Sequence, residues 1–174
     1  MRARLAAHGK QAAAGEERAL AALARGDATG AAVSVRQALH ALTGYLLESW
    51  GERDNSWGRL GTRLDALAAR HAEEERLEQL WELYGLGSGQ VEARMASAPA
   101  GIRHRHWRSF EARTLQGEDV SPWQDARDVL LAFSTRELRS AAPPYPFWVG
   151  LDVEPQGVKQ RVMALRQLLD GLGR

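Results

Sequence analysis

The chain of 174 residues is long enough to form one folded domain with a proper hydrophobic core. Its 23 basic and 22 acidic side chains give a formal net charge of +1, which excludes a global field that would draw the protein to nucleic acid or to a membrane. The absence of cysteine excludes disulfides, thiolate zinc sites and cysteine nucleophiles, and it favours a cytoplasmic location.

Two features of the sequence argue against a membrane protein or a secreted one. No stretch approaches the roughly 18 consecutive apolar residues that a membrane-spanning helix needs. The first ten residues are basic but lack a sustained apolar run, so we do not expect a signal peptide there.

The first fifty residues are predicted to form a helical hairpin. Residues 11–25 are rich in alanine and should form a firm helix, whereas Gly9 and Gly15 should leave its start frayed. Residues 26–30 supply a glycine that ends this helix and polar residues that can cap the next one. Residues 33–50 carry an apolar stripe with helical spacing, formed by Val35, Leu39, Leu42 and Leu46. We expect this second helix to be the spine of the fold.

Shorter helices are predicted for the middle of the chain, followed by a strongly capped one. Asn55 or Ser56 could cap a helix over 57–71, and another helix is expected over 73–84. Ser121-Pro-Trp-Gln124 combines an N-cap serine, a proline in the first turn and a glutamine that can close a capping box. A helix should therefore start there and run to about residue 138.

The last part of the chain is predicted to be a proline-rich strap and a final helix. Prolines exclude a helix over 141–148, which should lay Tyr145, Phe147 and Trp148 across the bundle in an extended conformation. The final helix should begin near Pro155 and pack along a heptad seam. The residues of this seam are Val158, Val162, Leu165, Leu169 and Leu172.

Together these patterns predict an all-α fold, an antiparallel helical bundle. Residues 1–140 should form the bundle domain. Residues 141–174 should add the strap and the C-terminal helix, packed on the same domain.

The most unusual segment is rich in arginine and histidine and leads the list of candidate sites. It contains Arg103, His104, Arg105, His106 and Arg108, next to the aromatic residues Trp107 and Phe110. Arginines beside aromatic rings suit phosphate contact combined with base stacking. His106 is also a candidate general acid or base for RNA cleavage. The alternative is a solvated basic face whose apolar members anchor the helix.

Two further candidates lie elsewhere in the chain. Arg36 and His40 are one helical turn apart and could offer an anion-binding donor and a titratable group, or could simply be a pair on the helix surface. Glu74, Glu75 and Glu78 match half of the magnesium motif of MazG-like nucleotide pyrophosphohydrolases. Met95 stands where the second half of that motif needs an aspartate, and an acidic face at a helix start is the alternative. No cofactor is implied.

Residues 16–71 resemble the opening hairpin of HEPN-type helical domains and of related domains paired with minimal nucleotidyltransferases. The resemblance lies in Ala-Leu-Ala-Arg25-Gly26-Asp27 and in Val35-Arg-Gln-Ala-Leu-His40-Ala-Leu, and it continues into Trp57-Gly-Arg-Leu60. Residues 107–133 are similar to the closing helices of these domains. The resemblance implies a four-helix core, frequent dimerisation, and binding of nucleotides or RNA. Some members are ribonucleases in which four to six residues separate an arginine from a following histidine.

The sequence therefore favours a non-catalytic helical protein that binds a nucleotide, RNA or a partner nucleotidyltransferase, and that forms a homodimer. The ribonuclease spacing is too short both at Arg103 and His106 and at Arg36 and His40. Two alternatives stay open: a structural or dimerisation bundle without a ligand, and a ribonuclease with a degenerate motif. A magnesium-dependent nucleotide pyrophosphohydrolase is a further, less favoured enzyme hypothesis.

Overall fold

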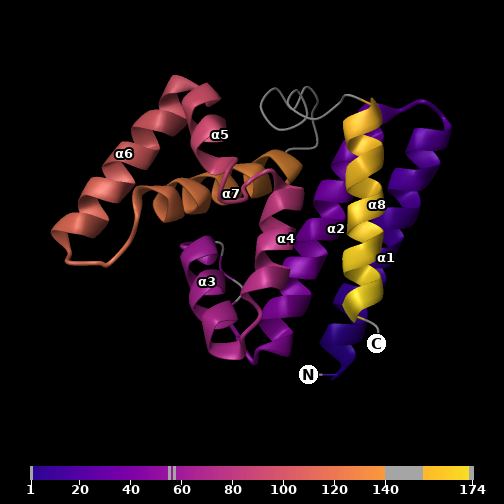
Figure 1. The fold of residues 1–174 in the computed structure, drawn as a ribbon, viewed down its shortest axis with the longest axis horizontal. Helices are drawn as coiled ribbons and strands as arrows, with labels where there is room; N and C mark the ends of the chain where they lie inside the picture. The colour runs from indigo at the N-terminus through magenta and orange to yellow at the C-terminus, as the bar shows by residue number, and fades with distance from the viewer. Residues whose placement is uncertain (1, 55, 57, 140–154, 173–174) are drawn as a thin grey trace. The chain divides into compact units, whose positions relative to one another are not determined.

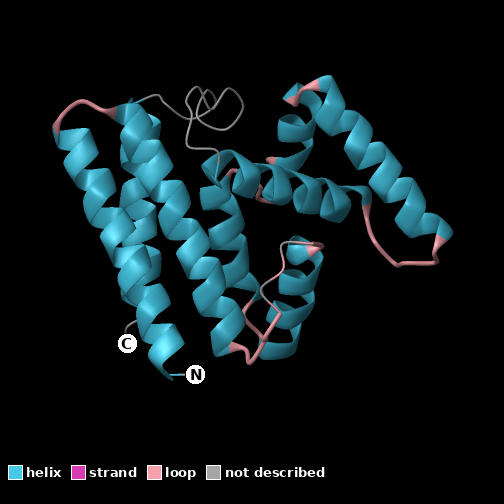
Figure 2. Ribbon diagram, turned by 180° about the vertical axis from the view of Figure 1, so that it is seen from behind, coloured by secondary structure: helices cyan, strands magenta, loops and turns pink. Residues whose placement is uncertain are grey.

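The computed structural model describes residues 2–54, 56, 58–139 and 155–172. These residues form eight α-helices joined by loops and contain no strand (Figures 1 and 2), which confirms the prediction of an all-α fold. Within the same residues, no helix is long and apolar enough to cross a membrane. The predicted strap, with Tyr145, Phe147 and Trp148, lies outside the described residues.

The chain forms two compact units. One unit comprises Met1–Asn55 and Ala142–Arg174, and the other comprises Ser56–Ala141. The sequence pattern instead predicted a bundle domain over residues 1–140, with the last helix packed on it. The difference arises because the final helix packs on the first two helices, so that contacts between distant parts of the chain define the first unit.

The first unit is built from α1 (Arg2–Ala24), α2 (Ala28–Ser49) and α8 (Pro155–Leu172), which lie side by side (Figure 1). The turn between α1 and α2 is the predicted one. Gly26 adopts a left-handed φ of 74°, and the carboxylate of Asp27 accepts a hydrogen bond from the Gly30 backbone N–H at 2.7 Å. The core of the hairpin is supplied mainly by α2, through Val35, Leu39, Leu42, Leu46 and Leu47.

The predicted frayed start of α1 was wrong, because the helix begins at Arg2 rather than near residue 11. Gly15, which lowers the local helix propensity, allows α1 to pack closely against α2. A Cβ atom built on Gly15 would lie 2.7 Å from the Cβ of Ala38 in α2, so only glycine allows the two backbones to approach this closely. Packing against α2 therefore outweighs the low helix propensity of Gly15.

The heptad seam of α8 lies against α1 and α2 of the same chain. Val158, Val162 and Leu165 are buried as the seam predicts, and Leu168 rather than Leu169 is the buried residue of the next turn. Arg166 of α8 also pairs with Glu16 of α1 at 3.1 Å. These apolar residues are thus used inside the unit.

The second unit contains five helices, α3 to α7. They are α3 (Leu60–His71), α4 (Glu74–Tyr84), α5 (Val91–Ser97), α6 (Ala100–Leu115) and α7 (Pro122–Arg139). The helix α7 is central to the unit, because α3, α5 and α6 all pack on it. Its residues 125–131 are buried without interruption, and Leu64, Leu80, Trp81 and Tyr84 complete the core from α3 and α4.

The capping predictions had different outcomes at α7 and α3. At α7, Gln124 N–H donates to the Ser121 hydroxyl at 3.1 Å and the Gln124 amide oxygen accepts from Ser121 N–H at 3.0 Å, which confirms the capping box. At α3 the predicted cap was wrong. The helix starts at Leu60 after Arg59, which has a φ of 54° and no side-chain cap.

We predict that alanine substitutions at the two α1 glycines have opposite effects on stability. Gly15→Ala should lower the urea midpoint, because overpacking a close contact costs about 1–3 kcal/mol and exceeds the gain in helix propensity. Gly9→Ala is the matched control. Nothing lies within 4 Å of its added Cβ, so the midpoint should rise by the equivalent of about 0.5–1 kcal/mol. Equal stabilisation by both changes would contradict the close contact.

Candidate functional site

The helix α6 has two chemically different faces. Ile102, His106 and Arg113 are buried, and their spacing places them on one side of the helix, toward α7. Two of these three positions are polar, where an ordinary amphipathic helix would carry apolar residues. Buried polar groups need partners, so α7 must supply acceptors.

Asp125 of α7 is the main acceptor and is completely buried. One carboxylate oxygen lies 2.9 Å from His106 Nδ1, and the other accepts hydrogen bonds from the Ser109 hydroxyl at 2.6 Å and from Arg113 Nη1 at 3.1 Å. All three partners belong to α6. We call the set formed by Thr62, His106, Ser109, Arg113, Asp125 and Asp128 the Asp125 network.

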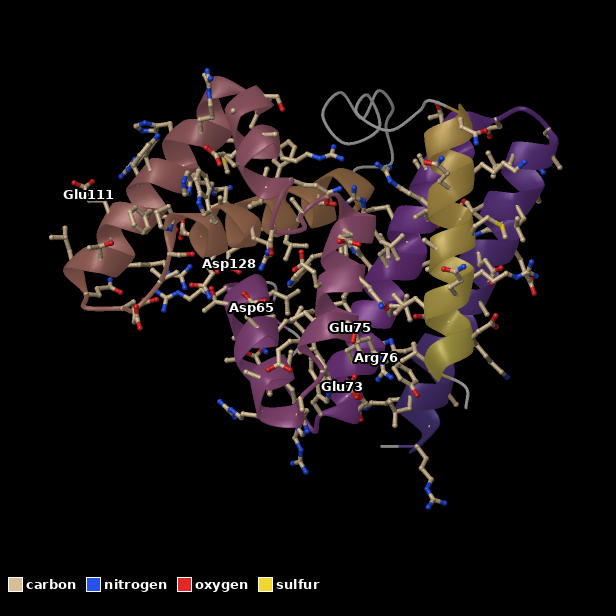
Figure 3. The ribbon with its side chains drawn as sticks, in the orientation of Figure 1. Asp65, Glu73, Glu75, Arg76, Glu111 and Asp128 are labelled. Carbon is tan, nitrogen blue, oxygen red and sulfur yellow. The ribbon has the colours of Figure 1, made fainter. Side chains whose placement is uncertain are left out.

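Arg113 extends the Asp125 network to α3 and to the loop before α7. Its guanidinium donates to Asp128 at 2.8 Å and to the Thr62 hydroxyl at 3.1 Å, and its Nε donates to Glu118 at 2.9 Å. Asp128 in turn accepts from the Thr62 hydroxyl at 2.7 Å and from its backbone N–H at 3.0 Å. Figure 3 shows Asp128 on the side of α7 that faces α3.

The electrostatics of the Asp125 network favour the ionised forms of Asp125 and Arg113. Burial raises the pKa of Asp125, but hydrogen bonds from His106, Ser109 and Arg113 outweigh burial and hold the pKa below its ordinary value. Burial likewise lowers the pKa of Arg113, and hydrogen bonds to Glu118, Asp128 and Asp125 raise it above the ordinary range. Asp125 and Arg113 therefore form a buried pair of opposite charges.

The opposite side of α6 is exposed, and we call it the α6 outer face. Its members are Arg103, His104, Arg105, Trp107 and Arg108. Trp107 is 64% exposed, more than Trp123, which is 43% exposed. Glu111, one turn further on, is the acidic residue on this side and points away from α7 (Figure 3). The α6 outer face thus combines guanidinium groups with an accessible indole ring.

The arginine- and histidine-rich segment was predicted to form one site, but the structure places its residues on two different sides of α6. Arg103, His104, Arg105 and Arg108 are all exposed on α6, where Arg103 Nη1 donates to the Ala96 carbonyl oxygen at 3.5 Å. His106 does not lie with them, because the residue is only 4% exposed and its Nδ1 is bonded to Asp125. The accessible part of the predicted site is therefore made of three arginines and one histidine, with Trp107.

Arg36 and His40, the second predicted pair, lie on α2 in the other unit. Arg36 is 8% exposed and is part of the core face of α2. His40 lines a surface pocket of about 400 Å³ together with residues of α1. The two side chains therefore occupy different environments, although they are one helical turn apart.

The glutamates of the half motif for magnesium also have different surroundings. Glu78 accepts a hydrogen bond from Ser88 N–H at 2.7 Å, and Glu74 and Glu75 are exposed near the start of α4. Figure 3 shows Glu73, Glu75 and Arg76 at this end of the helix. Among the described residues, no group of three or more histidine, aspartate or glutamate side chains could hold a metal ion. A magnesium site built from these glutamates alone is not supported.

A second cavity, of about 340 Å³, lies next to α4, with Glu74 and Glu78 in its lining. Arg127 of α7 closes one side, where its guanidinium lies 4.9 Å from the centre of the Trp81 ring and 3.2 Å from a carboxylate oxygen of Asp65. Burial raises the pKa of Asp65 above its ordinary value, although the charge of Arg127 opposes this. These contacts link α3, α4 and α7 and serve the packing of the unit.

Sequence reasoning missed Ser109, Arg113, Asp125 and Asp128. The sequence contained one indication that these residues form a buried polar network. The core positions of α6, counted from Ile102 in steps of three and four, are occupied by histidine, serine and arginine. Polar residues along a predicted core face indicate buried acceptors elsewhere, and Asp125 and Asp128 follow within the next helix. The sequence does not say which acceptors pair with which donors.

Comparisons with known proteins give no further assignment. No family model matches the chain, and no match was found among curated proteins or among solved structures.

We predict that Asp125→Asn destabilises the protein by about 3 kcal/mol at pH 7, because it removes a buried carboxylate that accepts hydrogen bonds from Ser109 and Arg113 and lies 2.9 Å from His106 Nδ1. The folded-state pKa of Asp125 is lowered, so the stability that it contributes is present above the ordinary value of 3.8 and is lost as the pH falls below it. Urea unfolding at several pH values should therefore show the difference between wild type and variant shrinking below that pH. Asp119→Asn, at an exposed position, is the control. A difference that does not depend on pH would contradict the role of the charge.

Proposed function

We propose that this protein is a non-catalytic helical binding protein that contacts single-stranded RNA through the α6 outer face. The observation that carries the proposal is the exposure of Arg103, Arg105 and Arg108 on the same helix as Trp107, which is 64% exposed. Guanidinium groups contact phosphates, and an exposed indole offers a stacking surface for an unpaired base. The net charge of +1 is compatible with such a local patch.

The Asp125 network supports the proposal because it sets the rotation of α6. Residues 106 and 113 are two turns apart, and both are held by carboxylates of α7. Rotation of the helix would therefore break buried charged hydrogen bonds, each worth about 1.5–3 kcal/mol. The three arginines and Trp107 are presented to solvent without further ordering of the backbone, which lowers the entropic cost of binding.

His106 has a positioning role in this proposal rather than a catalytic one. The residue is 4% exposed, and its contact with Asp125 orients the ring toward the interior of the unit. A carboxylate that orients an imidazole is also found in catalytic sites, and it is the feature that favours the ribonuclease alternative. RNA incubated with the protein should stay intact under this proposal. Cleavage that disappears in His106→Asn, a variant that can keep one hydrogen bond to Asp125, would support the ribonuclease.

The resemblance of residues 16–71 and 107–133 to HEPN-type domains supports three additional proposals. The first is that the protein forms a homodimer, and the second is that it binds a partner nucleotidyltransferase. The third is that it binds a nucleotide, a ligand chemically related to RNA. The cysteine-free composition supports a cytoplasmic location. Sedimentation at micromolar concentration tests the dimer, and co-purification with a nucleotidyltransferase encoded nearby tests the partner.

We predict that replacing Arg103, Arg105 and Arg108 together by glutamine weakens binding of single-stranded RNA and flattens its salt dependence. Each phosphate contact on a single strand contributes about 0.7 to the slope of log affinity against log salt, so the slope should fall by up to about 2. Fluorescence anisotropy across a salt series measures both effects. The control replaces Arg25, Arg53 and Arg70, which are also exposed, and has the same change in net charge. Equal losses in the two triple variants would show that charge alone is responsible.

We also predict that Trp107→Ala weakens RNA binding about tenfold without a change in the salt slope, because stacking on one base is worth about 1–3 kcal/mol. Trp123→Ala is the matched control, since Trp123 is 43% exposed and lies on α7. A loss of affinity in the control, with none in Trp107→Ala, would move the stacking surface away from α6.

A further inference from the structure

Glu111 is the neighbour of Trp107 on the exposed side of α6. Both residues are exposed, and a separation of four residues places two side chains on the same side of a helix, with Cβ atoms about 6 Å apart. Figure 3 shows Glu111 pointing away from α7. The Glu111 carboxylate is therefore within reach of the edge of a base that stacks on the Trp107 indole.

The surroundings of Glu111 leave its carboxylate open to a ligand. Glu111 is the only acidic residue of α6, and it forms no hydrogen bond or ion pair with another described residue. Phosphates repel a carboxylate, so a surface that contacts phosphates alone gains nothing from Glu111. A surface that also contacts a base gains a hydrogen-bond acceptor, which the side chains of arginine and tryptophan cannot supply.

The indole of Trp107 has a defined neighbour on the buried side of α6. The centres of the His106 and Trp107 rings are 5.7 Å apart, and the ring planes are inclined by 36°. His106 is in turn fixed by the buried carboxylate of Asp125, which lies 2.9 Å from its Nδ1. The Asp125 network thus holds the ring beside which the indole lies, while Trp107 stays 64% exposed for stacking.

The chemistry of a carboxylate distinguishes guanine from the other bases. Unpaired bases of RNA are recognised by stacking combined with hydrogen bonds to their Watson–Crick edges. The Watson–Crick edge of guanine presents two adjacent donors, N1–H and the amino group on C2. Adenine, cytosine and uracil each place an acceptor beside their single donor group on that edge. An ionised carboxylate accepts through both oxygens and donates nothing, so guanine is the base that satisfies it best.

We propose that Glu111 selects guanine at the position of the RNA strand that stacks on Trp107. The inference rests on the proposed contact between single-stranded RNA and the α6 outer face, and it adds the base that this contact favours. The arginines of the face contact phosphates, which are the same in every sequence and carry no base preference. The indole stacks on any base, so the preference comes from the carboxylate of Glu111.

Fluorescence anisotropy with the full chain and a set of labelled RNA strands tests the selection. The strands are short oligouridines that carry a single guanine, adenine, cytosine or uracil at the central position. The guanine strand should bind about tenfold more tightly than the other three, as expected for a bidentate contact between a side chain and a base. Inosine, which lacks the amino group on C2, should lose most of this preference, and 7-deazaguanine, which keeps the Watson–Crick edge, should retain it. Equal binding of guanine and inosine overturns the proposal.

Glu111→Gln then assigns the preference to one side chain. The variant should bind the four strands with nearly equal affinity, because a carboxamide offers one acceptor oxygen in place of two. Its affinity for the uracil strand should not fall, because the change removes a negative charge that repels phosphates. Glu92→Gln, at an exposed position of α5, has the same change in charge and should keep the guanine preference. An unchanged preference in Glu111→Gln overturns the proposal.

The same measurements distinguish a failure of the selection from a failure of the RNA contact. Tight binding of all four strands with equal affinity, weakened in Trp107→Ala, would overturn the guanine selection and leave the RNA contact on α6 standing. Absence of binding to every strand, or binding that Trp107→Ala does not change, would overturn both. A guanine preference that is lost in Glu111→Gln and in Trp107→Ala supports both.

Discussion

The arrangement of the second unit depends on one buried carboxylate, that of Asp125. It accepts hydrogen bonds from three side chains of α6, and Arg113 carries the connection on to Asp128 and Thr62. The free-energy cost of removing these charges from water offsets much of their mutual attraction. The network therefore adds little net stability compared with apolar packing. Its effect is orientation. An apolar seam tolerates rotation and sliding of a helix, whereas these hydrogen bonds are satisfied in one register only.

The orientation of α6 decides which of its side chains reach solvent. With His106 and Arg113 turned inward, Arg103, Arg105, Arg108 and Trp107 are turned outward. The same sequence segment therefore supplies both the anchor and the proposed binding surface. In the first unit, a comparable constraint comes from shape rather than charge. The absence of a side chain at Gly15 and Gly44 sets how closely α1 and α2 approach and leaves room for the His8 ring.

Local features of the structure could be predicted from the sequence, and distant pairings could not. The turn at Gly26 and Asp27 and the capping box at Ser121 and Gln124 involve residues within three positions of each other, so the pattern itself contains the interaction. Asp125 lies 19 residues from His106, and Asp128 lies 66 residues from Thr62. A single sequence does not reveal such pairs. The arginine- and histidine-rich segment was identified, but its division into an inner and an outer face depends on an acceptor in another helix.

The central claim, that RNA contacts the α6 outer face, is tested most directly by photocrosslinking. A single-stranded RNA that carries 5-iodouridine crosslinks to aromatic side chains that stack on the modified base, and mass spectrometry then identifies the attached residue. If RNA contacts this face, a crosslink is expected at Trp107, within the segment that contains Arg105 and Arg108. Crosslinks confined to other aromatic residues, such as Trp123, with none at Trp107, would contradict it.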